Sequence, residues 1–74
     1  MTDRTAHITP VDARIAMLQP VQLQVQEVAA EMGVSVSKLS RLLSGDDRWT
    51  KVQAIMVFTA IGRVQARKTM RAAA

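Results

Sequence analysis

The feature that most constrains this chain is a glycine that interrupts a helical pattern. The segment Glu31–Gly45 reads EMGVSVSKLSRLLSG, and Gly33 follows one amphipathic stretch while another begins within two residues. A glycine just past a helix end can take the left-handed conformation, which costs a residue with a side chain about 1 kcal/mol or more. The pattern therefore predicts two helices joined by a short turn.

The two stretches that flank Gly33 each show one apolar side. The first begins at Gln24, and its predicted inner face is Val25, Val28, Ala29 and Met32. In the second, Ser35 suits an N-cap and Gly45 ends the helix. We expect the apolar residues of this helix to face inward, namely Val36, Leu39, Leu42 and Leu43. We expect its polar residues to face outward, namely Ser37, Lys38, Ser40, Arg41 and Ser44.

A first helix is predicted from Thr9, with Thr9 as N-cap, Pro10 at the first position and Asp12 at the third. Its expected apolar stripe is Val11, Ile15 and Leu18, and its limit is set by Pro20. The following VQLQVQ alternates as a half-buried strand would. A lone strand would leave its backbone groups unpaired, so an extended connection ending near Leu23 is the alternative.

A fourth helix is predicted over residues 50–61, with Gly62 as its end. Its apolar residues cover more than one face, so part of that surface is expected to contact something outside the domain; they are Val52, Ile55, Met56, Phe58 and Ile61. Trp49 is expected to pack the preceding turn onto this helix. The chain is thus divided into an arm (1–8, with Arg4 and His7), a domain (9–62) and a basic helical tail (63–74).

Charge is distributed unevenly along the 74 residues, whose formal net charge is +4. Basic and acidic side chains balance up to residue 61, and the excess lies in the tail, at Arg63, Arg67, Lys68 and Arg71. A basic tail of this kind indicates an anionic partner, nucleic acid before membrane, with a plain solvated tail as the alternative. No apolar run reaches the roughly 18–20 residues that span a bilayer, and the N-terminus lacks a signal-peptide core. We therefore expect a cytoplasmic protein.

The composition argues against an enzyme. The chain has one histidine, no cysteine and no tyrosine, and it lacks a glycine-rich phosphate loop. Nothing pairs a nucleophile with a base or forms a metal cage. We expect no catalytic residue, no metal and no cofactor.

Two short helices around a glycine turn form a helix-turn-helix, whose second helix lies in the DNA major groove. Ala29 lies four residues before Gly33, where a larger side chain would force the helices apart. The predicted fold is all-α, a small domain of four to five helices with a central helix-turn-helix. An ordinary helical hairpin is the competing interpretation.

The run VAAEMGVSVSKLSRLL resembles the helix-turn-helix core of the lambda-repressor-like superfamily. With DRWTKVQAIMVFTAIG behind it, the chain is most similar to the phage CII-type transcriptional regulators, over residues 25–62. This resemblance implies a regulator, repressor or activator, encoded by a phage or prophage and acting in the bacterial host cytoplasm. It implies that the following residues face base edges or flanking phosphates: Ser35, Val36, Ser37, Ser40, Arg41 and Ser44.

Side-chain chemistry adds roles that do not depend on the resemblance. The forked guanidinium of Arg41 matches the O6 and N7 acceptors of guanine. Phosphate contacts are expected from Gln24, Gln26, Lys38 and Lys51. The expected partner is double-stranded DNA, bound by a homodimer through the fourth helix with Val64 and Met70. A tetramer is the alternative, and RNA polymerase would be a further partner of an activator. The competing function is a small helical adaptor that binds protein and no DNA.

Overall fold

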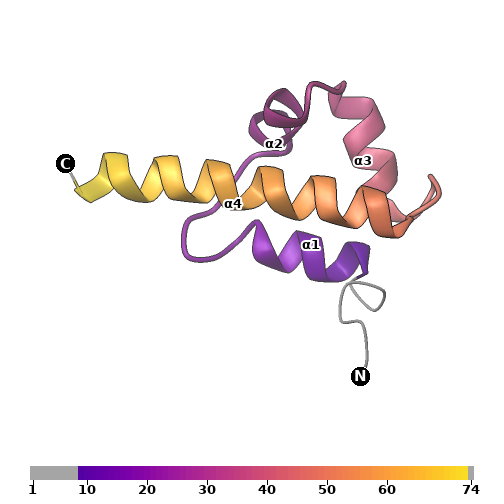
Figure 1. Cartoon of the computed structure of the whole chain (residues 1–74), viewed down its shortest axis with the longest axis horizontal. Coiled ribbons are helices and arrows are strands. Elements are labelled where there is room, and N and C mark those ends of the chain that lie inside the picture. The colour runs from indigo at the N-terminus through magenta and orange to yellow at the C-terminus, as the bar shows by residue number, and fades with distance from the viewer. Residues whose placement is uncertain (1–8, 74) are drawn as a thin grey trace.

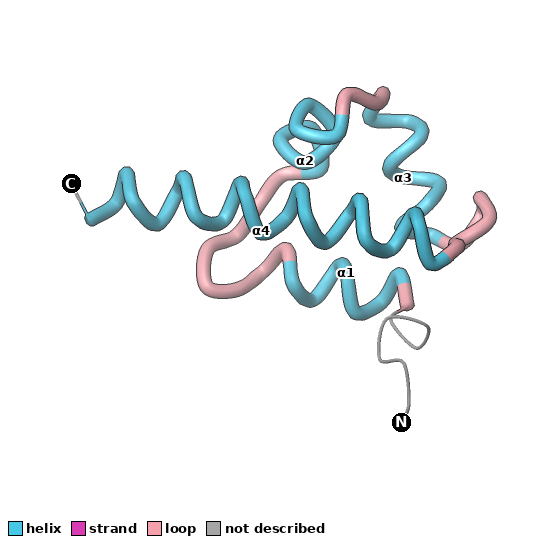
Figure 2. Tube along the Cα trace, viewed as in Figure 1, coloured by secondary structure: helices cyan, strands magenta, loops and turns pink. Residues whose placement is uncertain are grey.

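The structure is a computed structural model that describes residues 9–73. It contains α1 (Pro10–Ala16), α2 (Val25–Met32), α3 (Val36–Ser44) and α4 (Lys51–Ala73). Loops join these helices, and no strand occurs within the described range (Figure 2). The prediction of an all-α fold is confirmed. The predicted arm at residues 1–8 lies outside the described residues.

The helices form a flat molecule of 37 × 33 × 17 Å around the long helix α4. In Figure 1, α1 lies along one side of α4 and α2 on the other, while α3 stands steeply near the start of α4. Both α1 and α2 pack against α3 and α4. The core lies between the four helices, and its largest fully buried side chains are Leu39, Leu42, Val28 and Val57.

Helix α1 begins as its sequence predicts but buries a different side. The Asp12 amide donates to Thr9 Oγ1 (3.3 Å), and the Thr9 amide donates to Asp12 Oδ2 (2.9 Å). The helix packs through Ala13 and, just past its end, Met17, which are both buried. The predicted stripe is wrong, because its members are more than half exposed: Val11, Ile15 and Leu18. The small Ala13 lets the α1 backbone approach the core, and this turns the stripe toward solvent.

The connection from α1 to α2 is a loop with turns and bends over residues 17–21, and no strand forms in it. It ends just after Leu23, as the alternative interpretation expected, and α2 begins at Val25. Gln65 of α4, only 8% exposed, holds the connection in place. The Gln65 side-chain amide nitrogen lies 3.1, 3.1 and 2.7 Å from the carbonyl oxygens of Ala16, Gln19 and Val21. Its carbonyl oxygen accepts from the Val21 amide (3.1 Å). A side chain from α4 thus satisfies backbone groups that have no helix or sheet partner.

Helix α4 continues through Gly62 to Ala73, so the prediction that it ends at Gly62 is wrong. An interior glycine costs a helix roughly 0.5–1 kcal/mol relative to alanine. Burial on both sides of the glycine offsets this cost: Ala60 and Ile61 precede it, and Val64 and Gln65 follow it, all in the interior. Trp49, just before α4, is partly buried and packs against the core, and its predicted contact between the turn and α4 stays a prediction.

Candidate nucleic-acid interface

Helix α3 is fixed at both ends by local backbone chemistry. Gly33 ends α2 with φ of 74°, and the next amide, of Val34, donates to the Ala29 carbonyl (3.0 Å). Ser35 Oγ then accepts from the Lys38 amide (3.1 Å) and caps α3. Gly45 ends α3 with φ of 87°. The predicted boundaries of this helix are confirmed.

One side of α3 is exposed along its whole length. Leu39, Leu42 and Leu43 are buried, as predicted. The prediction for Val36 as an inward residue is wrong, since it is 47% exposed in the first turn, beyond the edge of the core. All six residues expected at base edges are exposed: Ser35, Val36, Ser37, Ser40, Arg41 and Ser44. At 3.6 residues per turn, the five that belong to the helix cover an arc of about 140°.

Asp47, in the loop after α3, binds two cations of that helix. Its Oδ2 atom lies 3.0 Å from Lys38 Nζ and 3.4 Å from Arg41 Nε. The hydrogen bond from Lys38 and the nearby Arg41 charge hold the pKa of Asp47 below its usual value of 3.8. The amides of Asp46 and Asp47 donate to the Arg41 carbonyl (2.9 and 3.2 Å), which folds the loop back onto α3.

Sequence reasoning gave Asp46 and Asp47 no functional role and did not predict this contact. The available signal was the glycine at 45, which reverses the chain so that the next acids can return to the last turns of α3. Ser44 is also bound locally: its hydroxyl lies 3.0 Å from Asp46 Oδ2 and 3.2 Å from the Arg41 carbonyl oxygen.

The residues expected at phosphates lie on three different elements. Gln24 and Gln26 are exposed at the start of α2, where the Gln24 amide donates to Glu27 Oε1 (2.8 Å). Lys38 is paired with Asp47, and Lys51 is exposed at the first position of α4. The four residues therefore come from α2 and its N-cap, from α3 and from α4.

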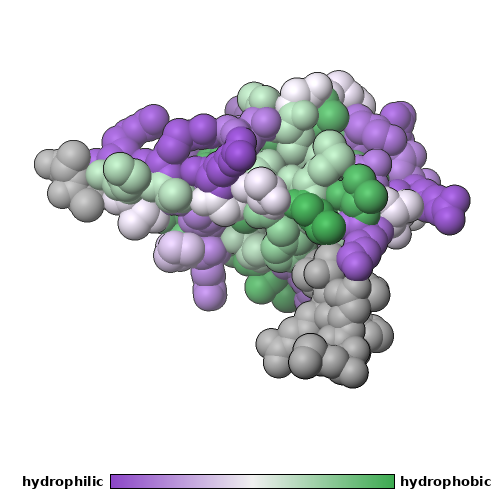
Figure 3. All heavy atoms as spheres, viewed as in Figure 1, coloured by the Kyte–Doolittle hydropathy of each residue, from purple (hydrophilic) through white to green (hydrophobic). Residues whose placement is uncertain are grey.

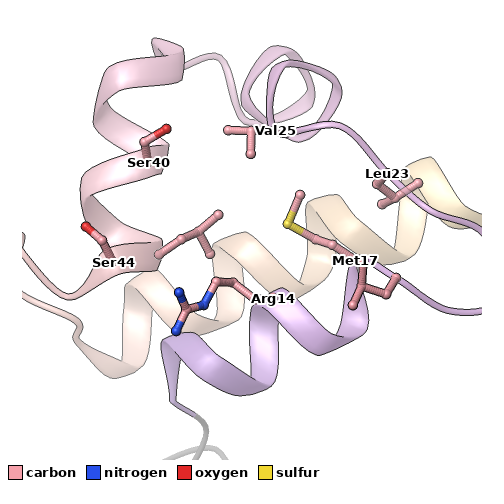
Figure 4. Close-up of a pocket in the computed structure, with 8 residues that line it drawn as sticks. Arg14, Met17, Leu23, Val25, Ser40 and Ser44 are labelled. Carbon is pink, nitrogen blue, oxygen red and sulfur yellow. The ribbon is translucent and has the colours of Figure 1, made fainter.

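A hollow of about 270 Å³ separates α1 from the exposed side of α3 (Figure 4). Its apolar lining is Met17, Leu18, Leu23, Val25 and Leu43. Its polar lining is Arg14, Ser40 and Ser44. Sequence reasoning gave Arg14 no role, because α1 lies outside the motif and only the tertiary fold places it beside α3.

Three of the four tail cations bind acids of α2. Arg67 Nη2 lies 2.6 Å from Glu31 Oε1, and Arg63 Nη1 lies 3.7 Å from Glu31 Oε2. Lys68 Nζ lies 2.8 Å from Glu27 Oε1. These three cations thus hold α4 against α2, and the contact of the basic stretch with an anionic partner stays a prediction.

These ion pairs also shift the pKa values of the two acids. The hydrogen bond from Lys68 lowers the pKa of Glu27, and the hydrogen bond from Arg67 lowers that of Glu31, both from a usual 4.5. Residues 9–73 contain no group of three or more side chains suited to hold a metal ion. Within the same range, no helix has the length and apolar character needed to cross a membrane.

Comparison with protein-family models, with curated proteins and with solved structures found no match to this chain.

Proposed function

We propose that the protein is a sequence-specific regulator of transcription that binds double-stranded DNA. In this proposal α2, the turn at residues 33–35 and α3 form a helix-turn-helix, and α3 enters the major groove. The observation that carries the proposal is the division of α3 into a buried leucine side and an exposed side of hydroxyls with one guanidinium. The resemblance to CII-type regulators adds a phage or prophage origin and action in the bacterial cytoplasm.

Arg41 is the residue assigned to base recognition. Its contact with Asp47 uses Nε, and no ion pair engages its two terminal nitrogens within the described chain. Those nitrogens can donate together to O6 and N7 of a guanine, a contact that discriminates between bases by about 1–3 kcal/mol. The serines beside Arg41 are short, so the helix can approach the base edges closely. Asp47 restricts the rotamers of Arg41 and in this way orients the fork.

A single domain of this size reads few bases, so we propose that a homodimer binds two half-sites. Exposed apolar residues of α4 support a subunit contact there: Val52, Ile55 and Met56. The sequence also predicted Val64 in this contact, which is wrong because Val64 is 3% exposed and belongs to the core. Met70, in contrast, is exposed.

A protein-binding adaptor is the second candidate function. It is favoured by exposed apolar residues on α1 and just past its end, which the first candidate does not use: Val11, Ile15 and Leu18. Figure 3 shows hydrophobic residues gathered in the middle of one face, with hydrophilic residues along the far part of α4.

Selection from a random duplex pool, followed by affinity measurements at several salt concentrations, separates the two candidates. A regulator enriches one sequence, and a protomer that neutralises about five phosphates gives a log–log salt slope of about −4 to −5. Arg41→Ala should remove the preference between the selected and a scrambled duplex while leaving most general affinity. Arg71→Ala, which removes the same charge at the far end of α4, is the matched control.

Two results would count against the proposal. Absence of duplex binding at low salt would favour the adaptor. A sequence preference that survives Arg41→Ala, with the fold intact by circular dichroism, would remove α3 from the recognition role.

A further inference from the structure

We propose that Arg14 of α1 binds a backbone phosphate of the DNA duplex. This phosphate lies at the edge of the major groove that α3 enters. This inference rests on the proposed function and extends the DNA-binding surface to a helix outside the helix-turn-helix. It assigns Arg14 a contact with the sugar-phosphate chain and none with a base.

The position of Arg14 relative to α3 is the first reason. Arg14, Ser40 and Ser44 line one hollow, and both serines belong to the exposed side of α3. Figure 4 shows the guanidinium of Arg14 turned from α1 toward α3, on the side of Ser44. The major groove is about 12 Å wide, and a helix with its side chains is about 10–12 Å across. A helix in the groove therefore fills it, and a side chain immediately beside the helix meets the phosphates at the groove edge.

The second reason is that no acid within residues 9–73 pairs with the guanidinium of Arg14. The residues that line the hollow include no carboxylate, and Arg14 makes no ion pair within residues 9–73. Five other cations of the domain differ from Arg14 in this respect, since each binds an acid: Lys38, Arg41, Arg63, Arg67 and Lys68. A phosphate at Arg14 would displace no partner among residues 9–73, so the new charge-assisted hydrogen bond is gained there without losing another.

The apolar lining supplies a third reason. Met17 and Leu18 follow Arg14 in the chain and line the same hollow. A long basic side chain can lay its methylene groups against such a surface and keep its charged end in water. Arg14 is exposed, so its charged end is available to a strand that approaches α3.

The test uses Arg14→Ala and the control Ile15→Ala, at the next and exposed position of α1, with the selected duplex and an unrelated duplex. Loss of one phosphate contact should weaken binding of both duplexes by the same factor, roughly fivefold to tenfold. It should also reduce the size of the log–log salt slope by about 0.9. Arg14→Lys should retain the slope, and Ile15→Ala should change neither quantity.

Three outcomes would overturn the inference. If the wild type binds but Arg14→Ala behaves like Ile15→Ala, the Arg14 contact is absent and the proposed function stands. If Arg14→Ala weakens one duplex much more than the other, Arg14 reads bases instead of the backbone. If the wild type binds no duplex, the proposed function fails and the Arg14 contact fails with it. Circular dichroism of each variant establishes that the fold is retained.

Discussion

The buried amide of Gln65 performs a task that secondary structure performs elsewhere in the chain. Residues 17–24 connect α1 to α2 without a helix or strand, and Gln65 satisfies several of their backbone groups. Nothing in the sequence marks this glutamine among its exposed neighbours on a basic helix. Its role depends on α4 lying across the connection, so it could not be predicted from local pattern.

We expect Gln65→Leu to lower the free energy of unfolding by about 2–3 kcal/mol, because it leaves buried backbone groups without partners. For a domain of this size, that corresponds to a loss of roughly 10 °C or more in the melting temperature. Thermal unfolding followed by circular dichroism measures the change. Gln26→Leu, at an exposed position, should change stability by less than about 0.5 kcal/mol. Equal stability of the two variants would contradict the bracing role of Gln65.

Single residues of the candidate interface were predictable to different degrees. The exposure of Ser37, Ser40 and Arg41 follows from helical spacing alone, because the neighbouring leucines fix which side is buried. The contact of Asp47 with α3 depends on how the loop returns, and Arg14 depends on where α1 packs. Spacing within one segment carries no information about either.

At the scale of the helices, local signals predicted the ends of α2 and α3 correctly. Caps and left-handed glycines act within a few residues, so the sequence around Gly33 and Gly45 was sufficient. The rule that a glycine marks the end of a helix failed at Gly62. There the helix continues, because the residues around Gly62 are buried and because ion pairs join α4 to α2. Those contacts join positions more than thirty residues apart, as in the pair of Lys68 with Glu27.

Two glycine substitutions should therefore have opposite effects. Gly33→Ala should destabilise the protein by about 1–2 kcal/mol, because the backbone there has φ of 74°. Gly62→Ala should stabilise it by about 0.5–1 kcal/mol, because it removes backbone freedom in the middle of a helix. A Cβ atom at either site would meet nothing within 4 Å. Steric clash therefore contributes to neither change in stability.

Urea unfolding of the two variants, with the wild type alongside, measures both changes. A destabilised Gly62→Ala would show that the helix does not run straight through this position. An unchanged Gly33→Ala would show that the turn relaxes out of the left-handed region.

At the scale of the whole molecule, ion pairs join α2 to the second half of α4. The cations of α4 bind Glu27 and Glu31 of α2, and the pKa values of both acids are lowered. A lowered pKa in the folded state means that the stabilisation is fully present above the usual pKa of 4.5 and is lost as pH falls through the lowered value. The net charge of +4 thus includes cations already occupied within the fold.

We expect the double variant Glu27→Gln/Glu31→Gln to melt below the wild type at pH 7, with a gap that closes as pH falls below about 4.5. Added salt should also reduce the gap, since the pairs are partly exposed. Thermal unfolding from pH 7 to pH 3 tests this expectation. Asp47 titrates in both proteins, so its contribution cancels in the difference. A gap that persists at pH 3 would assign the loss to packing rather than charge.

The two-sided character of α3 has a consequence for how such a protein could diversify. The residues that determine its fold are the buried Leu39, Leu42 and Leu43, the capping Ser35, and the glycines that end α2 and α3, Gly33 and Gly45. The exposed positions 36, 37, 40, 41 and 44 make no contribution to the apolar interior. Substitutions at those five positions, by evolution or by design, could therefore change the chemistry of this surface while the fold is kept.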